Sequence, residues 1–135
     1  TGVQTCALPI FTHQTKQVPP MDALADAVSA GPTVAYIEDV PTFIAPASKP
    51  IHSKLGRQFG FWEGICAASG VPVRLVKPQK WQKGIAGVDG KTGMDRKRAL
   101  CAEARRIFPM HKITLDNCDA VLLADYARRM ERGSQ

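Results

Sequence analysis

A strand, a helix and a second strand follow one another between residues 33 and 76, and this order constrains the fold more than any other feature. Residues 33–40 are rich in β-branched and aromatic residues and lie between Pro32 and Pro41, as expected of a strand. Residues 71–76 form a second strand by the same pattern. Because a helix between two strands makes a βαβ crossover, the sequence predicts parallel strands and an α/β fold.

The stretch between the strands predicts a helix over residues 53–69. Ser53 is a favoured N-cap residue, and Gly70 is typical of the position just past a helix C-terminus. Residues on one side of this helix recur at intervals of three and four, as on the buried face of an amphipathic helix. They are Leu55, Phe59, Trp62, Cys66 and Ser69.

Three more helices are expected. They cover residues 21–30, residues 94–108 and a segment from Asp116 or Asn117 to about Arg132. The helix over 94–108 is expected to bury Leu100, Cys101, Ala104, Ile107 and Phe108. The last helix is expected to bury Ala120, Leu123, Ala124, Ala127 and Met130. Residues 84–93 are rich in Gly and Asp and predict a flexible loop.

The composition is that of one soluble globular domain. The chain has 135 residues, of which 44% are hydrophobic and 22% charged. No apolar run approaches membrane-spanning length. The four cysteines form no C-x-x-C pair, and the three histidines have no zinc-ligand spacing. We therefore expect reduced thiols in an intracellular protein.

Residues 1–10 differ from the rest of the chain. They carry no charged side chain and show neither helical nor strand periodicity. They resemble the translation of a sequencing-library adaptor, and they lack the basic start and long apolar core of a signal peptide. We therefore expect residues 1–10 to be foreign to the protein and residues 11–135 to be its single domain.

Basic residues concentrate in one segment. The net charge is +6 at pH 7, and residues 74–106 hold ten Lys and Arg residues against three acidic ones. Such a segment suits a polyanion such as nucleic acid, although a solvated helix face is the ordinary alternative. The Trp81 ring either stacks beside nucleic acid or belongs to the core. The candidate nucleic-acid-binding residues are Lys77, Lys80, Trp81, Lys83, Lys91, Arg96, Lys97 and Arg98.

Three acidic residues are candidates for a metal site. Glu38 stands in an apolar strand, where an ionised carboxylate is costly unless it reaches water or meets a cation. Asp116 and Asp119 are three residues apart, which places both on one side of a helix, although Asp116 also suits an N-cap. If strand and helix abut, the three carboxylates form a cluster suited to Mg²⁺ or Mn²⁺. Two such ions, about 3.5–4 Å apart, support phosphodiester cleavage.

Five segments in this order resemble the RuvC-type Holliday-junction resolvases of phages and prophages. They are residues 34–38 (VAYIE), 55–57 (LGR), 60–64 (GFWEG), 76–83 (VKPQKWQK) and 116–120 (DNCDA) with 122–124 (LLA), within a similarity that runs from about Met21 to Arg129. The resemblance implies an RNase H-like α/β fold, here without its first strands. It also implies a homodimer that cuts four-way DNA junctions in recombination and repair, in the cytoplasm of a bacterium or of a phage's host.

The resemblance also assigns roles to individual residues. Glu38 matches an acid on the family's fourth strand, and Asp116 and Asp119 match a D-x-x-D pair at the last helix. The family holds divalent metal with four acids, so these three are the expected catalytic metal ligands for Mg²⁺ or Mn²⁺. Lys97 matches a basic residue at the start of the preceding helix. The basic residues from Lys77 to Lys97, with Arg105 and Arg106, are expected to contact phosphates.

One departure from the family concerns its first catalytic Asp. That residue stands on the first strand, upstream of every segment recognised here. Asp22 and Asp26 lie in a predicted helix and cannot replace it. We therefore expect a parent protein with two further strands and most of a third, and an impaired nuclease activity in this chain.

Two other functions are compatible with the same residues. One is a non-catalytic, basic DNA-binding module of RNase H-like fold, in which the acids are caps and surface charges. The other is a different RNase H-like nuclease, such as a transposase or an RNA-strand nuclease, which shares the chemistry and differs in substrate.

Overall fold

The structure, a computed structural model, describes residues 34–39 and 49–133, with side chains for residues 34–39 and 59–133. These residues fall into two compact units, with the boundary between Lys77 and Pro78. We call residues 34–77 the βαβ unit and residues 78–133 the helical unit, and each is described by itself. The expected helix over 21–30 and residues 1–10 lie outside the described residues.

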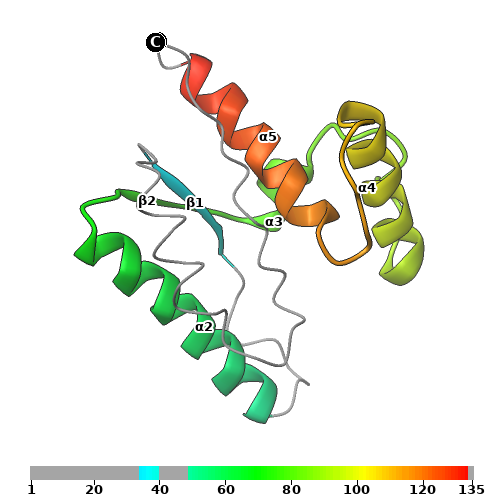
Figure 1. The fold of residues 1–135 in the computed structure, drawn as a ribbon. Helices are drawn as coiled ribbons and strands as arrows, with labels where there is room; N and C mark the ends of the chain where they lie inside the picture. Colours follow the sequence, from blue (N-terminus) through cyan, green and yellow to red (C-terminus); the bar gives the residue numbers. More distant parts are fainter. Residues whose placement is uncertain (1–33, 40–48, 134–135) are drawn as a thin grey trace. The chain divides into compact units, whose positions relative to one another are not determined.

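The βαβ unit has the predicted order and direction of strands (Figure 1). Strand β1 covers Ala35–Glu38, helix α2 covers Lys49–Ala68 and strand β2 covers Val73–Val76. The strands are parallel, with Ala35 opposite Val73 and Glu38 opposite Val76. A backbone bond of 2.9 Å from the Asp39 N–H to the Val76 carbonyl extends the pairing. The prediction of a parallel βαβ arrangement is confirmed.

Helix α2 begins ahead of Ser53, so the predicted N-cap there is wrong. Pro50 lies in the first turn of α2, where a proline is tolerated because its missing N–H would have no helical partner. The predicted end is confirmed. Gly70 follows the helix with a φ of 72°, and the Val71 N–H donates to the Cys66 carbonyl at 2.9 Å. These features make a Schellman motif, which closes the helix before β2.

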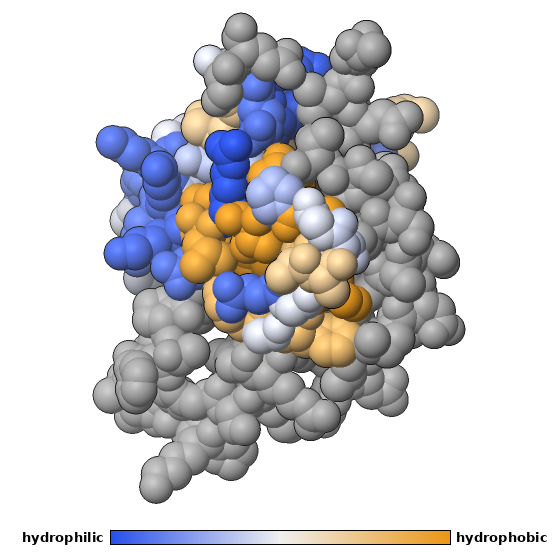
Figure 2. Space-filling model, turned by 90° about the vertical axis from the view of Figure 1, so that its left-hand side faces the viewer, coloured by the Kyte–Doolittle hydropathy of each residue, from blue (hydrophilic) through white to orange (hydrophobic). Residues whose placement is uncertain are grey.

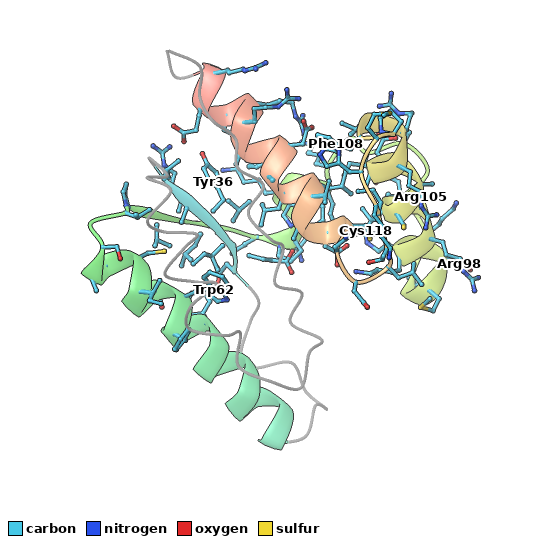
Figure 3. All side chains as sticks on the ribbon, in the orientation of Figure 1. Tyr36, Trp62, Arg98, Arg105, Phe108 and Cys118 are labelled. Atoms are coloured by element: carbon cyan, nitrogen blue, oxygen red, sulfur yellow. The ribbon has the colours of Figure 1, made fainter. Side chains whose placement is uncertain are left out.

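Helix α2 packs against β2, and the contact buries few side chains among the described residues of the βαβ unit. Cys66, Val71 and Val76 are buried. Trp62 is half-buried and lies on the side of α2 that faces the strands (Figure 3). Leu75 in β2 is 48% exposed. The strands of this unit are therefore only partly covered by α2.

The helical unit has its own core. It contains helix α3 (Pro78–Gln82), helix α4 (Gly93–Ile107) and helix α5 (Cys118–Gly133). Helix α5 packs against both α3 and α4 (Figure 1). The largest fully buried side chains are Trp81, Val88, Cys101 and Cys118. Leu100, Cys101 and Ala104 are buried as predicted, and Trp81 belongs to the core.

The predicted buried face of α5 is wrong for most of its residues. Cys118, Val121, Leu122, Leu123, Asp125 and Tyr126 are buried. Of the predicted set only Leu123 is among them, and Met130 is 42% exposed. The helix is apolar nearly all round between residues 120 and 124, so periodicity alone leaves its orientation open. Burying Val121, Leu122 and Tyr126 removes more apolar area from water than burying alanines does.

The segment between α3 and α4 is a series of turns rather than an irregular loop. The Ile85 N–H donates to the Gln82 carbonyl, the Val88 N–H to the Ile85 carbonyl and the Lys91 N–H to the Val88 carbonyl, at 3.2–3.4 Å. The Val88 side chain has no exposed surface. The turns therefore fix the backbone on both sides of one residue that is anchored in the core.

On the face drawn in Figure 2, hydrophobic residues gather in one area with hydrophilic side chains beside it. Within residues 34–39 and 49–133, no helix has the length and apolar character needed to cross a membrane.

Candidate functional site

A tight turn sets the start of α5 and places the two aspartates of the predicted pair. The Thr114 N–H donates to Asn117 Oδ1 at 2.8 Å, and the Asn117 N–H donates to Thr114 Oγ1 at 3.3 Å. The Asn117 carbonyl accepts the Val121 N–H at 3.1 Å, so Asn117 is the N-cap residue. Asp116 lies in the turn and is exposed. Its carboxylate is therefore not needed to cap the helix.

Asp119 lies in the first turn of α5 and forms an ion pair with Lys97 of α4. Lys97 Nζ donates to Asp119 Oδ2, across 22 residues of sequence. The Lys97 side chain is 19% exposed and that of Asp119 is 41% exposed. The pair thus joins two packed helices at the edge of the core, where solvent screens it less than a fully exposed pair.

The second oxygen of Asp119 faces a buried thiol. Cys118 Sγ lies 3.8 Å from Asp119 Oδ1 and 3.6 Å from the Leu115 carbonyl oxygen. Burial, together with the negative charge of Asp119, raises the pKa of Cys118 to about 12. The sulfur therefore stays protonated at neutral pH, and its S–H can donate weakly to either oxygen.

Glu38 is the last residue of β1 and is half-buried. The side chains of alternate residues share one face of a strand, so Glu38 lies on the same face as Tyr36. Arg74, directly opposite Tyr36 in β2, has its guanidinium carbon 5.9 Å from the centre of the Tyr36 ring. This register places a cation diagonally across the strands from Glu38. The acid predicted as a metal ligand thus stands on a face that also carries a positive charge.

The predicted three-acid cluster is divided between the two units. Glu38 belongs to the βαβ unit, and Asp116 and Asp119 belong to the helical unit. Among the described residues, no group of three or more His, Cys, Asp or Glu side chains is gathered so that it could hold a metal ion. The convergence of Glu38 with the two aspartates stays a prediction.

The predicted nucleic-acid-binding residues differ in how much of each side chain is exposed. Lys77, Lys80, Lys83, Lys91 and Arg98 are exposed. Arg98 projects outward from α4 (Figure 3) and is 70% exposed, with Asp95 at 3.8 Å. Trp81 is 1% exposed, so it does not offer a ring face to a stacked base. The alternative interpretation, that Trp81 belongs to the core, is the one the structure supports.

Arg96 has a structural contact within the helical unit. Its Nε donates to Gln82 Oε1 at 2.9 Å, its Nη2 donates to the same oxygen, and its Nη1 donates to the Lys91 carbonyl at 3.4 Å. The guanidinium therefore ties α4 to α3 and to the intervening turns. A phosphate would have to compete with these acceptors for Arg96.

The C-terminal end of α4 carries two more arginines with internal partners. Arg105 Nη2 donates to the Ile113 carbonyl at 3.3 Å. Arg106 Nη2 and Glu103 Oε1 are 2.7 Å apart. The hydrogen bond from Arg106, with its positive charge, holds the pKa of Glu103 below its usual range, against a smaller opposing effect of burial.

Asp125 is a buried acid that the sequence analysis did not single out. It is 7% exposed, and its carboxylate contacts Arg128 Nη2 at 2.7 Å and Arg129 Nε at 3.2 Å. Arginines three and four residues after an acid are a helical ion-pair pattern that is visible in the sequence. Because both arginines come from α5 itself, this network stabilises the helix locally.

Comparison with known proteins identifies the fold. No protein-family model matches the chain, and no curated protein matches it. Among solved structures it is similar to the RuvC structure from Thermus thermophilus, with a TM-score of 0.52 and 17% sequence identity over 88% of this chain and 74% of that one. This similarity supports a RuvC-like, RNase H-like α/β fold, of which the parallel βαβ unit and the helices that follow it are a part.

Proposed function

We propose that this chain is a metal-dependent, structure-specific endodeoxyribonuclease that cleaves phosphodiester bonds in branched DNA. Its substrate would be the four-way junction formed during recombination and repair of DNA, including the DNA of a phage genome. The active form would be a homodimer. One observation carries the proposal. Asp119 lies in the first turn of α5 in a RuvC-like fold, and its carboxylate pairs with the Lys97 ammonium.

The carboxylates of the helical unit suit a hard divalent cation. Asp116 is exposed and Asp119 is partly exposed, so both have oxygens within reach of solvent. Asp119 already accepts one positive group, the Lys97 ammonium, which stands in for a cation at Oδ2. In the proposal Asp116, Asp119 and Glu38 hold Mg²⁺ or Mn²⁺. A bound ion of this kind lowers the pKa of water and offsets charge on phosphate oxygens.

The exposed cations of the helical unit would position the DNA. Lys80, Lys83, Lys91 and Arg98 carry side chains that can contact phosphates without changing any internal contact of the core. Phosphate contacts fix the position of a duplex but do not read its sequence. The binding they provide should therefore weaken steeply as salt concentration rises.

Metal binding by the full chain tests the proposal. Mn²⁺ affinity is measured by calorimetry for the wild type, for Asp119→Asn and for the control Asp95→Asn, which removes an acid that is 80% exposed. We expect Asp119→Asn to weaken Mn²⁺ binding by about tenfold or more, and Asp95→Asn to leave it nearly unchanged. Equal affinities in all three chains would contradict the assignment of Asp119.

A cleavage assay defines the substrate class. A four-way junction, a linear duplex and an RNA–DNA hybrid of matched sequence are incubated with the chain and Mn²⁺. We expect slow cleavage of the junction alone, which Asp119→Asn abolishes. Preferential cleavage of the hybrid would instead support an RNA-strand nuclease, and preferential cleavage of the linear duplex would support a transposase-like enzyme.

A second candidate function is DNA binding without cleavage. The exposed lysines of the helical unit favour it, because they can bind phosphates with no metal. In that case Asp119→Asn would retain full affinity for both Mn²⁺ and a four-way junction, and none of the three substrates would be cut.

A further inference from the structure

The Lys97–Asp119 pair has a consequence for how a metal ion reaches the site. Lys97 Nζ donates to Asp119 Oδ2, and Cys118 Sγ lies at the other oxygen, Oδ1. Both oxygens of this carboxylate therefore already have donor groups within the helical unit. A divalent ion needs a lone pair of the same carboxylate, and it is repelled by an ammonium group held beside that oxygen.

We propose that Lys97 and a divalent cation compete for Asp119. Lys97 pairs with the carboxylate in the metal-free chain, and this ion pair breaks when the divalent ion binds. The inference rests on the proposed function, because it requires Asp119 to be a metal ligand. It adds a regulation of that site: the tethered ammonium compensates the charge of Asp119 without metal and lowers the affinity for the ion.

The position of Lys97 suits such an exchange. Its side chain is 19% exposed, so the ammonium has a path to solvent, while its backbone is fixed in α4. Arg96, its neighbour, is held by Gln82 and the Lys91 carbonyl and does not contact Asp119 in the structure. The competing group is therefore one side chain, which can be changed alone.

The first test measures Mn²⁺ affinity after the ammonium is removed. Lys97→Met keeps an unbranched side chain of similar length and loses the charge. Because competition is a negative coupling between two cations, we expect Mn²⁺ to bind about tenfold more tightly to Lys97→Met. The control Arg98→Met removes an equal charge from a side chain that is 70% exposed and paired with Asp95 rather than Asp119. Its Mn²⁺ affinity should change by less than about twofold, because solvent and salt screen that charge.

The outcomes separate this inference from the proposed function. If the wild type binds Mn²⁺ through Asp119 but Lys97→Met binds it no more tightly, the competition is wrong and the metal site stands. If Asp119→Asn binds Mn²⁺ as well as the wild type and Lys97→Met do, both ideas fail. Circular dichroism checks that each variant is folded before affinities are compared.

A second test needs no variant. Amine-reactive acylation of the wild-type chain is followed for each lysine by mass spectrometry, with and without Mg²⁺. Release from Asp119 should raise the labelling rate of Lys97 severalfold when Mg²⁺ is added, while the rate of exposed Lys91 stays constant. A Lys97 rate that does not rise with Mg²⁺ overturns the proposal.

Discussion

The two units of this chain differ in how their side chains are buried. In the helical unit Trp81, Val88, Cys101 and Cys118 are fully buried, and α5 packs against both α3 and α4. In the βαβ unit the described residues of β1 are all half-buried, and Leu75 of β2 is about half exposed. The comparison indicates that the helical unit has a local core, whereas the described strands depend on further contacts for their stability.

The largest expected effect is the loss of the Trp81 ring from the core of the helical unit. Truncating a fully buried Trp removes its transfer free energy and leaves a cavity, so Trp81→Ala should lower the free energy of unfolding by about 3–5 kcal/mol. Leu75→Ala, at a partly exposed site of the βαβ unit, should cost less than about 1 kcal/mol. Urea unfolding followed by circular dichroism measures both.

The same variant can show whether the units unfold together. Trp62 in α2 is the one tryptophan left in Trp81→Ala, so its fluorescence reports on the βαβ unit. If Trp81→Ala lowers the urea midpoint of the Trp62 fluorescence transition as much as the midpoint followed by circular dichroism, the βαβ unit depends on the helical unit. Equal costs for Trp81→Ala and Leu75→Ala would contradict the difference in burial.

An intermediate effect is expected in thiol reactivity. Cys66 lies in the βαβ unit, while Cys101 and Cys118 lie in the helical unit, and all three are buried. Labelling of a buried thiol requires local opening, so a less stable unit exposes its cysteine more often. We expect Cys66 to react at least about tenfold faster than Cys118. This ratio corresponds to an opening free energy that is lower for Cys66 by at least ~1.4 kcal/mol.

Peptide-resolved mass spectrometry at pH 7 and pH 9 measures these rates. Burial raises the pKa of Cys66 and, with the charge of Asp119, that of Cys118 to about 12. Cys118 in the closed structure therefore stays protonated at pH 9 and does not react. Raising the pH should accelerate its labelling only through the locally opened state, in which the exposed thiol ionises more readily. Equal rates for the two cysteines would show that the units open as one.

The smallest expected effect is the pH dependence of one ion pair in the helical unit. Arg106 lowers the pKa of Glu103, so the pair contributes stability above the unfolded pKa of the carboxyl group and loses it as pH falls through the folded pKa. Arg106→Ala should slightly lower the melting temperature at pH 7. The difference should fade between about pH 5 and pH 3. A difference that grows toward low pH would contradict this sign.

Much of the βαβ unit could be predicted because its signals are local. Prolines bracket β1, and Gly70 marks the end of α2 through its own backbone conformation. The start of α2 could not be predicted, because Pro50 is compatible with both a loop and a first helical turn. The face of α5 was also missed, because its apolar residues surround the helix and the choice depends on what α3 and α4 present to it.

The candidate site shows the same division between local and distant information. The D-x-x-D spacing identified Asp116 and Asp119, and the reciprocal bonds of Thr114 and Asn117 explain why Asp116 is left exposed. The contact between Lys97 and Asp119 joins residues far apart in sequence, so helical periodicity could not reveal it. Family resemblance singled out both Lys97 and Asp119, but not the ion pair between them.

The burial of Val88 should protect the glycine-rich segment between α3 and α4 from proteases. Proteases cleave loops that can be drawn out into an extended strand, and a composition like that of residues 84–93 usually allows it. Here the middle residue has no exposed surface, and bonded turns lie on either side of it. Because cleavage of this segment would first require Val88 to leave the core, trypsin is expected to cut slowly after the exposed Lys83 and Lys91 in the native protein.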